Sequence, residues 1–236
     1  MDEHSATDGE AVGSTPTMRT ILEDKMNTVR GTRLLIGDEA KSIRSILSTF
    51  RIMSDANGFE EIILPSLEFL EVYTNKAGKE IENQMYVFKD KSNRSLCLRP
   101  EGTATCQILA NTIFKYKKDV KLFYEIRCWR YEKPQAGRYR EFTQFGVEIL
   151  NPSESYHDYL LNFAKNMVEF IIKPIECKDG VKRGLSYYTQ EGFEISAPIL
   201  GAQKQIVGGG RYKEGIGFAI GVDRLQKALK IQRGVV

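Results

Sequence analysis

The sequence predicts an α+β domain in which helices pack against a mostly antiparallel β-sheet. Two stretches with strand-like composition, 121–131 and 140–150, flank a loop rich in proline, glycine and arginine, which is the pattern of a long antiparallel hairpin. Between 153 and 172, large apolar side chains recur with helical spacing and would line one side of a helix. Hairpins combined with helices on one face are typical of the α+β class.

Composition describes an ordinary globular chain. Its 236 residues are enough for one large domain or two small ones, and 42% of them are hydrophobic and 28% charged. The net charge of +3 is too small to indicate nucleic-acid binding by bulk field, so any RNA contact must come from a local patch. No apolar run approaches the ~20 residues of a membrane-spanning helix, and the acidic N-terminus lacks the apolar region of a signal peptide. We therefore expect a cytoplasmic protein without a membrane partner.

Cysteine usage argues against a metal centre. Cys97, Cys106, Cys128 and Cys177 form no C-x-x-C pair, and the chain has only two histidines. A metal site built from cysteine and histidine clusters is therefore not expected. The pattern instead fits isolated, buried thiols in a reducing compartment.

The amino-terminal segment 1–17 contains almost no large apolar side chains, so it cannot offset the entropy of becoming ordered. We expect a disordered tail there, followed by one folded domain over 18–236. The first helix of that domain is expected over Asp38–Ala56, because apolar side chains spaced at i, i+3, i+4 and i+7 form one face and Asp38 can cap its start.

The other predicted elements are shorter. In chain order they are a strand at 59–64 ended by Pro65, two short strands at 85–89 and Ser95–Leu98, a helix at 102–116 and a closing helix at 222–231. Between 172 and 222, short strands are expected to alternate with glycine turns.

The strongest chemical signal lies in the loop of the long hairpin. Arg130, Arg138 and Arg140 fall within eleven residues, and planar guanidinium groups are suited to bidentate contacts with phosphate. Glu132 lies between them and could orient a guanidinium or accept from the amino group of a base. From these residues alone, a solvated basic turn remains the alternative.

The block RYEKPQAGRYREFTQFGVE at 130–148 resembles the second signature motif of class II aminoacyl-tRNA synthetases in its histidyl version. The resemblance implies that Arg130 binds the α-phosphate of ATP and the carboxylate of histidine, and that Glu132 contacts adenine. It implies that the loop 133–140, which includes Arg138 and Arg140, holds the ATP tail and approaches the acceptor end of tRNA.

Two residues in this block depart from the family pattern. Tyr131 replaces the usual His, which we expect to perturb the ATP pocket mildly. Lys133 replaces the usual Arg, which we expect to weaken contact with the acceptor stem.

A second group of matches concerns the amino acid. The stretch LRPEGT at 98–103 resembles a family stretch in which Glu101 and Thr103 would face the ammonium and backbone of histidine, and Gln144 and Glu148 match residues that hold the α-amino group. An ammonium needs a carboxylate, and Glu101, Gln144 and Glu148 together can cage one. Taken alone, Glu101 fits equally well as a helix-start residue favoured by the helix dipole.

The stretch KRGLSYYT at 182–189 resembles the histidine-specific RGLDYYT of the family. The resemblance implies that Arg183 stabilises charge developing on the α-phosphate, and that Tyr187 and Tyr188 line the imidazole pocket. Ser186 stands where Asp is common, so we expect a carboxylate near the imidazole or near Arg183 to be missing. From the residues alone, a strand with two packed tyrosines remains the alternative.

Three further matches complete the pattern. GFEEIILP at 58–65 resembles the first class II motif, which forms the dimer interface in the family, and GGGRY at 208–212 matches a family turn. The stretch 217–225 resembles the third motif, which implies that Arg224 stacks on adenine and reaches the γ-phosphate.

The resemblance implies a class II, histidyl-type catalytic core that binds ATP with Mg²⁺ on its phosphates, binds histidine, forms histidyl-adenylate and works as a homodimer. Family members carry an inserted helical domain before the histidine stretch and an anticodon-binding domain after the third motif, whereas this chain ends twelve residues after Arg224. The missing domains are the ones that grip tRNA, so the resemblance implies activation of histidine and leaves charging of tRNA-His open.

Two alternative functions remain open. One is a paralogue that senses histidine as the regulatory subunit of ATP-phosphoribosyltransferase, although retention of Arg130, Arg183 and Arg224 argues against it. The other is an adenylate donor to an acceptor other than tRNA.

Overall fold

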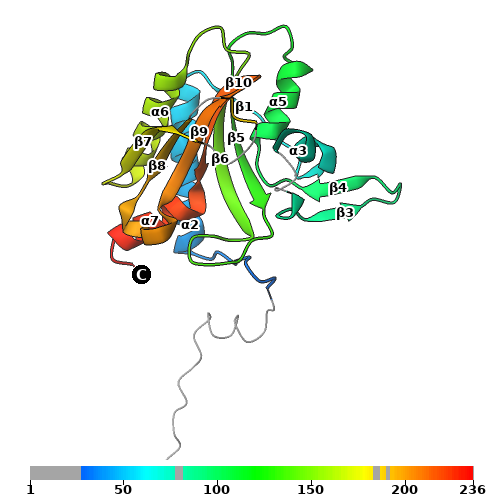
Figure 1. Ribbon diagram of the computed structural model, residues 1–236. Helices are drawn as coiled ribbons and strands as arrows, with labels where there is room; N and C mark the ends of the chain where they lie inside the picture. The colour runs from blue at the N-terminus through cyan, green and yellow to red at the C-terminus, as the bar shows by residue number, and fades with distance from the viewer. Residues whose placement is uncertain (1–27, 78–81, 183–186, 190–191, 236) are drawn as a thin grey trace, which may run out of the picture.

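The computed structural model describes residues 28–77, 82–182, 187–189 and 192–235 (Figure 1). The tail predicted over 1–17 lies outside these residues. One seven-stranded sheet forms the centre of the molecule. In sheet order its strands are β1 (Glu60–Glu61), β5 (Val120–Trp129), β6 (Glu141–Leu150), β10 (Gly215–Gly221), β9 (Gln205–Tyr212), β8 (Gly192–Ser196) and β7 (Glu176–Val181).

The large sheet is antiparallel except at one edge. Strands β5 and β6 form the predicted long hairpin, paired from Val120 opposite Leu150 to Trp129 opposite Glu141. Among the described residues, only the two of β1 pair in parallel, with β5. The expected α+β class with a mostly antiparallel sheet is confirmed.

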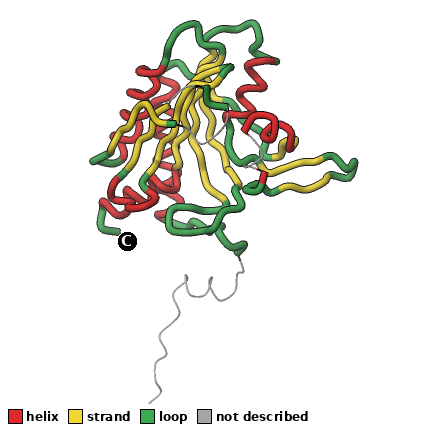
Figure 2. Tube along the Cα trace, in the orientation of Figure 1, coloured by secondary structure: helices red, strands yellow, loops and turns green. Residues whose placement is uncertain are grey.

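Three helices cover one face of this sheet (Figures 1 and 2): α2 (Asp38–Ala56), α6 (His157–Ile171) and α7 (Val222–Gln232). Alternate strand residues such as Phe145 and Phe218 point towards them and are buried. Phe50 of α2 meets Phe145 edge to face, with ring centroids 5.4 Å apart. No helix of the described residues is both long enough and apolar enough to cross a membrane.

The opposite face is only partly covered. Helix α5 (Thr103–Asn111) lies against β6 and β10, and beside it are α3 (Leu70–Ala77) and a three-stranded sheet of β2 (Leu67–Phe69), β4 (Ser95–Leu98) and β3 (Val87–Lys89). A second apolar cluster, which includes Tyr73, Tyr124 and Leu150, joins this group to the large sheet. The part of the face that α5 leaves open holds the cavity described below.

The structure shortens three predicted elements and adds two that were not predicted. The strand expected at 59–64 is reduced to β1, and the helix expected to reach 116 ends at Asn111. The helix expected from 153 begins at His157, because the backbone N–H and hydroxyl of Ser153 bind the carboxylate of Asp119, at 2.7 and 2.6 Å, and fix the preceding residues as a turn. Strand β2 and helix α3 were not predicted.

The cysteines differ from expectation at one position. Three of the four thiols are buried and unpaired, as predicted, but Cys177 is exposed. Cys177 lies on β7, an edge strand whose residues are mostly exposed.

Candidate active site

A cavity of about 380 Å³ opens on the sheet face opposite α2, α6 and α7. This volume is within the range of pockets for small ligands. Side chains from the start of α5, the hairpin loop, the large sheet and the start of α7 form its walls. The predicted site residues among them are Glu101, Thr103, Arg130, Glu132, Arg138, Gln144, Tyr187, Tyr188 and Arg224.

Three arginines form one group in the cavity wall. The Nε atom of Arg130 donates to the carbonyl of Pro100 at 2.9 Å, and the guanidinium faces the ring of Phe142. Arg224 donates to the carbonyls of Gly137 and Gln205, both at 2.9 Å. Backbone carbonyls therefore orient the guanidinium groups of Arg130 and Arg224, and they use part of the five donors of each group.

Glu132 lies within the arginine group and is ion-paired with Arg138. Burial opposes its ionisation, but the hydrogen bond from Arg138 and the nearby charges of Arg130 and Arg224 outweigh burial and lower the pKa of this carboxyl. Burial lowers the pKa of Arg224, and the charge of Arg138 adds to the effect. The wall thus keeps an excess of positive charge around one carboxylate, which suits an anionic ligand.

Glu101 belongs to a second group, around the start of α5. Its carboxylate accepts the backbone N–H groups of Thr103 at 2.6 Å and Ala104 at 3.0 Å, so it caps this helix as well as lining the cavity. The hydroxyl of Tyr187 donates to it at 3.4 Å. Burial raises the pKa of Glu101, although the two backbone N–H groups and the charge of Arg130 oppose the rise.

Glu148 is fully buried and lies behind the cavity wall, not among the lining residues. Its carboxylate accepts three hydroxyl groups, from Thr103 at 2.7 Å, Tyr212 at 2.8 Å and Tyr124 at 3.2 Å. Burial raises its pKa to about 7. In this structure Glu148 reaches the cavity through the side chain of Thr103.

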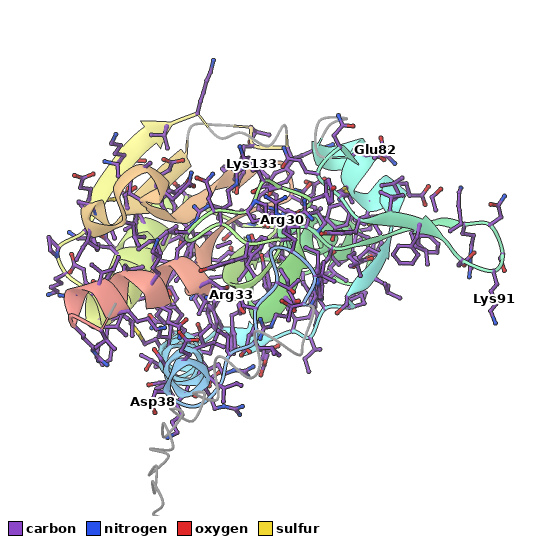
Figure 3. The ribbon with its side chains drawn as sticks, turned by 90° about the horizontal axis from the view of Figure 1, so that it is seen from below. Arg30, Arg33, Asp38, Glu82, Lys91 and Lys133 are labelled. Atoms are coloured by element: carbon purple, nitrogen blue, oxygen red, sulfur yellow. The ribbon has the colours of Figure 1, made fainter. Side chains whose placement is uncertain are left out.

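Three other residues of the hairpin loop lie outside the cavity. The guanidinium of Arg140 stands 4.0 Å above the ring of Tyr131, and neither residue lines the cavity. Tyr131 instead packs edge to face against Tyr86. Lys133 is exposed on the face shown in Figure 3. Arg183 and Ser186 lie outside the described residues.

The cavity also contains residues that the sequence did not single out. These are Gln84, Tyr139, Phe142, Gln205, Ile206 and Asp223, together with the small residues Gly137, Gly208, Ala219 and Gly221. Tyr139 and Asp223 lie inside the second and third motif stretches, next to Arg138 and Arg224. Their place in the sequence could therefore have indicated that they line the cavity. Gln84 lies in no motif, and only the tertiary fold brings it to the wall.

Within the described ranges, no three His, Cys, Asp or Glu side chains are grouped closely enough to hold a metal ion. Two carboxylates of the cavity wall, those of Glu132 and Asp223, are already paired with arginines. The wall is therefore better suited to anions than to a metal ion of its own.

Comparison with known proteins identifies relatives over most of the chain. Residues 31–171 match the family described as Histidyl-tRNA synthetase. The histidine–tRNA ligase of Archaeoglobus fulgidus is 30% identical over 318 positions, which cover 89% of this chain and 78% of that protein. The enzyme of Aquifex aeolicus is 40% identical over 138 residues, which cover 56% of this chain and 34% of that protein.

The Archaeoglobus alignment has more positions than the 236 residues of this chain. That relative therefore carries residues inside the aligned region that have no counterpart here.

Solved structures share the fold. The apo histidyl-tRNA synthetase of S. aureus superposes with a TM-score of 0.74 at 24% identity, covering 89% of this chain and 72% of that one. A Bacillus halodurans protein described as an ATP phosphoribosyltransferase regulatory subunit/histidyl-tRNA synthetase gives 0.75 at 16% identity, covering 92% of this chain and 84% of that one. At these identities the likeness concerns the fold alone.

Proposed function

Because the chain belongs to the histidyl-tRNA synthetase family, we propose that it binds ATP and histidine in this cavity and joins them into histidyl-adenylate. The observation that carries the proposal is the pairing of two chemically different groups in one cavity. Arg130, Arg138 and Arg224 supply positive charge, while Glu101 and Gln144 supply oxygen acceptors. A triphosphate suits the first group, and the ammonium of an amino acid suits the second.

Arg130 adjoins both groups: its Nε donates to the carbonyl of Pro100, the residue before Glu101, and its charge favours the ionised form of both Glu101 and Glu132. In the proposed reaction a carboxylate oxygen of histidine attacks the α-phosphorus of ATP. The bond from that phosphorus to the bridging oxygen of pyrophosphate breaks as the new bond forms. Arg130 would hold the two reacting groups together, and Arg138 and Arg224 would bind the departing phosphates.

No side chain need act as a general base, since the substrate carboxylate is already ionised at neutral pH. The contribution of the protein is therefore positioning and stabilisation of negative charge. Arg183, outside the described residues, is proposed as a further cation at the α-phosphate. Mg²⁺ is proposed to arrive with the phosphates of ATP, which are its usual ligands in such sites.

Three features of the proposal concern partners. Histidine is the proposed amino acid because of the family and of Tyr187 and Tyr188, which line the cavity with ring centroids 4.7 Å apart. The proposed acceptor of the histidyl group is the 3′ end of tRNA, near the exposed Lys133. A homodimer is proposed through the segment 58–65, where Ile63 is 89% exposed.

ATP–pyrophosphate exchange with each of the twenty amino acids tests the proposed activity. We expect exchange with histidine only. Arg183→Ala and Arg130→Ala should reduce exchange at least about 100-fold without unfolding the chain, because each removes charge stabilisation from the α-phosphate. Arg127→Ala is the matched control, since Arg127 is an exposed residue of the same hairpin outside the cavity.

Two results would contradict the proposal. Exchange that is unchanged in Arg183→Ala would remove that residue from the reaction. If no amino acid supports exchange but histidine still raises the melting temperature, the chain is better explained as a histidine sensor. Where exchange is present, transfer of labelled histidine with and without tRNA distinguishes tRNA from another acceptor.

A further inference from the structure

The segment 28–37, here called the strap, leads into α2 and crosses the hairpin loop on the outside of the cavity. The carbonyl of Gly31 accepts the backbone N–H of Arg140 at 2.8 Å. Gly31 has a φ of +89°, and a Cβ atom there would come within 2.8 Å of the Arg140 side chain. Glycine thus allows the strap to approach the loop this closely.

Arg33 is the strap residue that contacts the cavity wall from behind. Its guanidinium lies 3.7 Å from the centroid of the Tyr139 ring and forms an ion pair with Asp223. Tyr139 and Asp223 both line the cavity, whereas Arg33 does not. Figure 3 shows Arg33 and Arg30 in the middle of the view, below Lys133 and far from Lys91 at the tip of the β3–β4 hairpin.

The two residues that Arg33 contacts are sequence neighbours of the proposed phosphate-binding arginines. Tyr139 follows Arg138 in the hairpin loop, and Asp223 precedes Arg224 at the start of α7. The same two segments are also joined on the cavity side, where Arg224 donates to the carbonyl of Gly137 at 2.9 Å. Arg33 is therefore an outer clamp between the loop and α7.

Asp223 extends this clamp into the sheet. Its second carboxylate oxygen accepts the backbone N–H of Thr143 at 2.6 Å, so the ion pair with Arg33 is fixed to β6. The Asp223 side chain is 5% exposed and that of Arg33 is 26% exposed. A partly buried guanidinium that stacks on a ring and pairs with a carboxylate has little freedom to move.

We infer that Arg33 is a positioning residue for the nucleotide: through Tyr139 and Asp223 it holds Arg138 and Arg224 in the arrangement that binds the triphosphate, without touching the triphosphate itself. This inference rests on the proposed function only in assigning ATP to the arginine group. It predicts a selective effect, because Arg33 has no contact with Glu101 or Gln144 among the described residues.

The test uses the whole chain and three variants. In Arg33→Ala both contacts are lost, so ATP should bind about tenfold more weakly, as expected when displaced groups lose their alignment. Binding of histidine should stay within about twofold. In Arg33→Lys the charge opposite Asp223 is kept but the planar stack on Tyr139 is lost, and we expect an intermediate loss.

Arg30→Ala is the matched control, because Arg30 is an exposed arginine of the same strap that does not line the cavity. Titration calorimetry with ATP and with histidine gives the two dissociation constants separately. Pyrophosphate exchange gives the Michaelis constants for ATP and histidine and kcat for the same proteins.

Several outcomes are decisive. Equal weakening of ATP and histidine binding, or no weakening of ATP binding, overturns the positioning role. Wild-type protein that binds ATP but gives no exchange refutes the proposed function and still tests Arg33 by calorimetry. Wild-type protein that does not bind ATP overturns both.

A double-mutant cycle covers the case in which Arg33→Ala fails to fold. Asp223→Asn removes the ionic partner but keeps an oxygen for the N–H of Thr143, and it should weaken ATP binding in the same direction. Adding Arg33→Gln, which removes the charge, to this variant should cost less than Arg33→Gln alone, because the ion pair with Asp223 is already absent. Fully additive effects would show that the two residues act independently and would overturn the clamp.

Discussion

The carboxyl group of Glu148 has an unusual setting: it is fully buried, yet it accepts hydroxyl groups from three distant parts of the chain. In an unfolded chain it would ionise near its ordinary pKa of 4.5, whereas in the folded protein burial raises its pKa to about 7. Between these values the folded state keeps a proton that the unfolded state has lost. Stability therefore falls as pH rises through this window, by about 3 kcal/mol.

Glu148→Gln should remove this pH dependence, because the amide cannot ionise but keeps an oxygen for hydrogen bonding. The free energy of unfolding in urea, measured from pH 4.5 to 8, should fall for the wild type relative to the variant up to about pH 7 and run parallel above it. Glu101 is present in both proteins and its charge helps to raise the pKa of Glu148, so the difference reports the ionisation of Glu148 together with its coupling to Glu101. Parallel curves over the whole range would contradict the raised pKa.

At the residue scale, the motifs predicted which side chains gather around the cavity better than they predicted which of these side chains reach its wall. Nine of the predicted residues line one cavity, although they lie as far apart in the sequence as Glu101 and Arg224. Arg140 and Glu148 belong to the same motif but are turned to other surroundings. The hydroxyl partners of Glu148 come from α5, β5 and β9, and no local pattern indicates that they meet.

At the element scale, strand β10 passes very close to the buried carboxylate of Glu148 on the neighbouring strand β6. A Cβ atom at Gly217 would lie 1.9 Å from Oε2 of Glu148 and 2.5 Å from the carbonyl oxygen of Val147. The carbonyl belongs to the paired strand β6 and cannot move away without breaking the ladder. Only a residue without a side chain fits at this position.

Gly217→Ala should therefore destabilise the protein by about 1–3 kcal/mol, the usual cost of overfilling a packed interior. Gly221→Ala, on the same strand, is the control, because its Cβ would meet only the carbonyl of Ile206 at an ordinary 3.6 Å. Urea unfolding of both variants at one pH checks the difference. Equal stability of the two variants would mean that β10 and β6 shift apart more easily than the register indicates.

Elements with many residues and a clear period were predictable, and elements fixed by tertiary contacts were not. The spacing of apolar residues gave α2 over the same bounds as observed, and the long hairpin followed from two strand-like stretches around a turn-forming loop. Helix α3 has only eight residues and a weak apolar face. It is fixed largely through Tyr73, which is fully buried and donates to the carbonyl of Glu101 at 3.2 Å.

At the scale of the whole molecule, the proposed homodimer explains an apolar surface near the first motif. Phe59 and Leu64 are buried in their own chain, but Ile63 between them is 89% exposed, and Leu67 and Phe69 nearby are 51% and 44% exposed. Large apolar side chains exposed this close together in the sequence are candidates for burial in a protein interface. The segment 58–65 is where the sequence predicts a second copy to bind.

Ile63→Glu should convert the dimer into a monomer, because the new charge would be buried against the partner and unpaired. Light scattering at micromolar concentration should give twice the chain mass of 26.9 kDa for the wild type and a single mass for the variant. Ile113→Glu, at another exposed isoleucine, is the control and should stay dimeric. A wild-type mass of one chain would contradict the proposal outright.

Because side chains alternate along β6 and β10, these two strands pack against the helices with one face and line the cavity with the other. Phe145 and Phe218 hold the helices, while their neighbours Gln144 and Ala219 face the cavity. Cavity-side positions can therefore be randomised in a library while every core residue stays constant. A selection for a different amino-acid substrate would then vary only a few positions on two strands. Most of the stability of the fold should be unchanged, because the core residues stay the same.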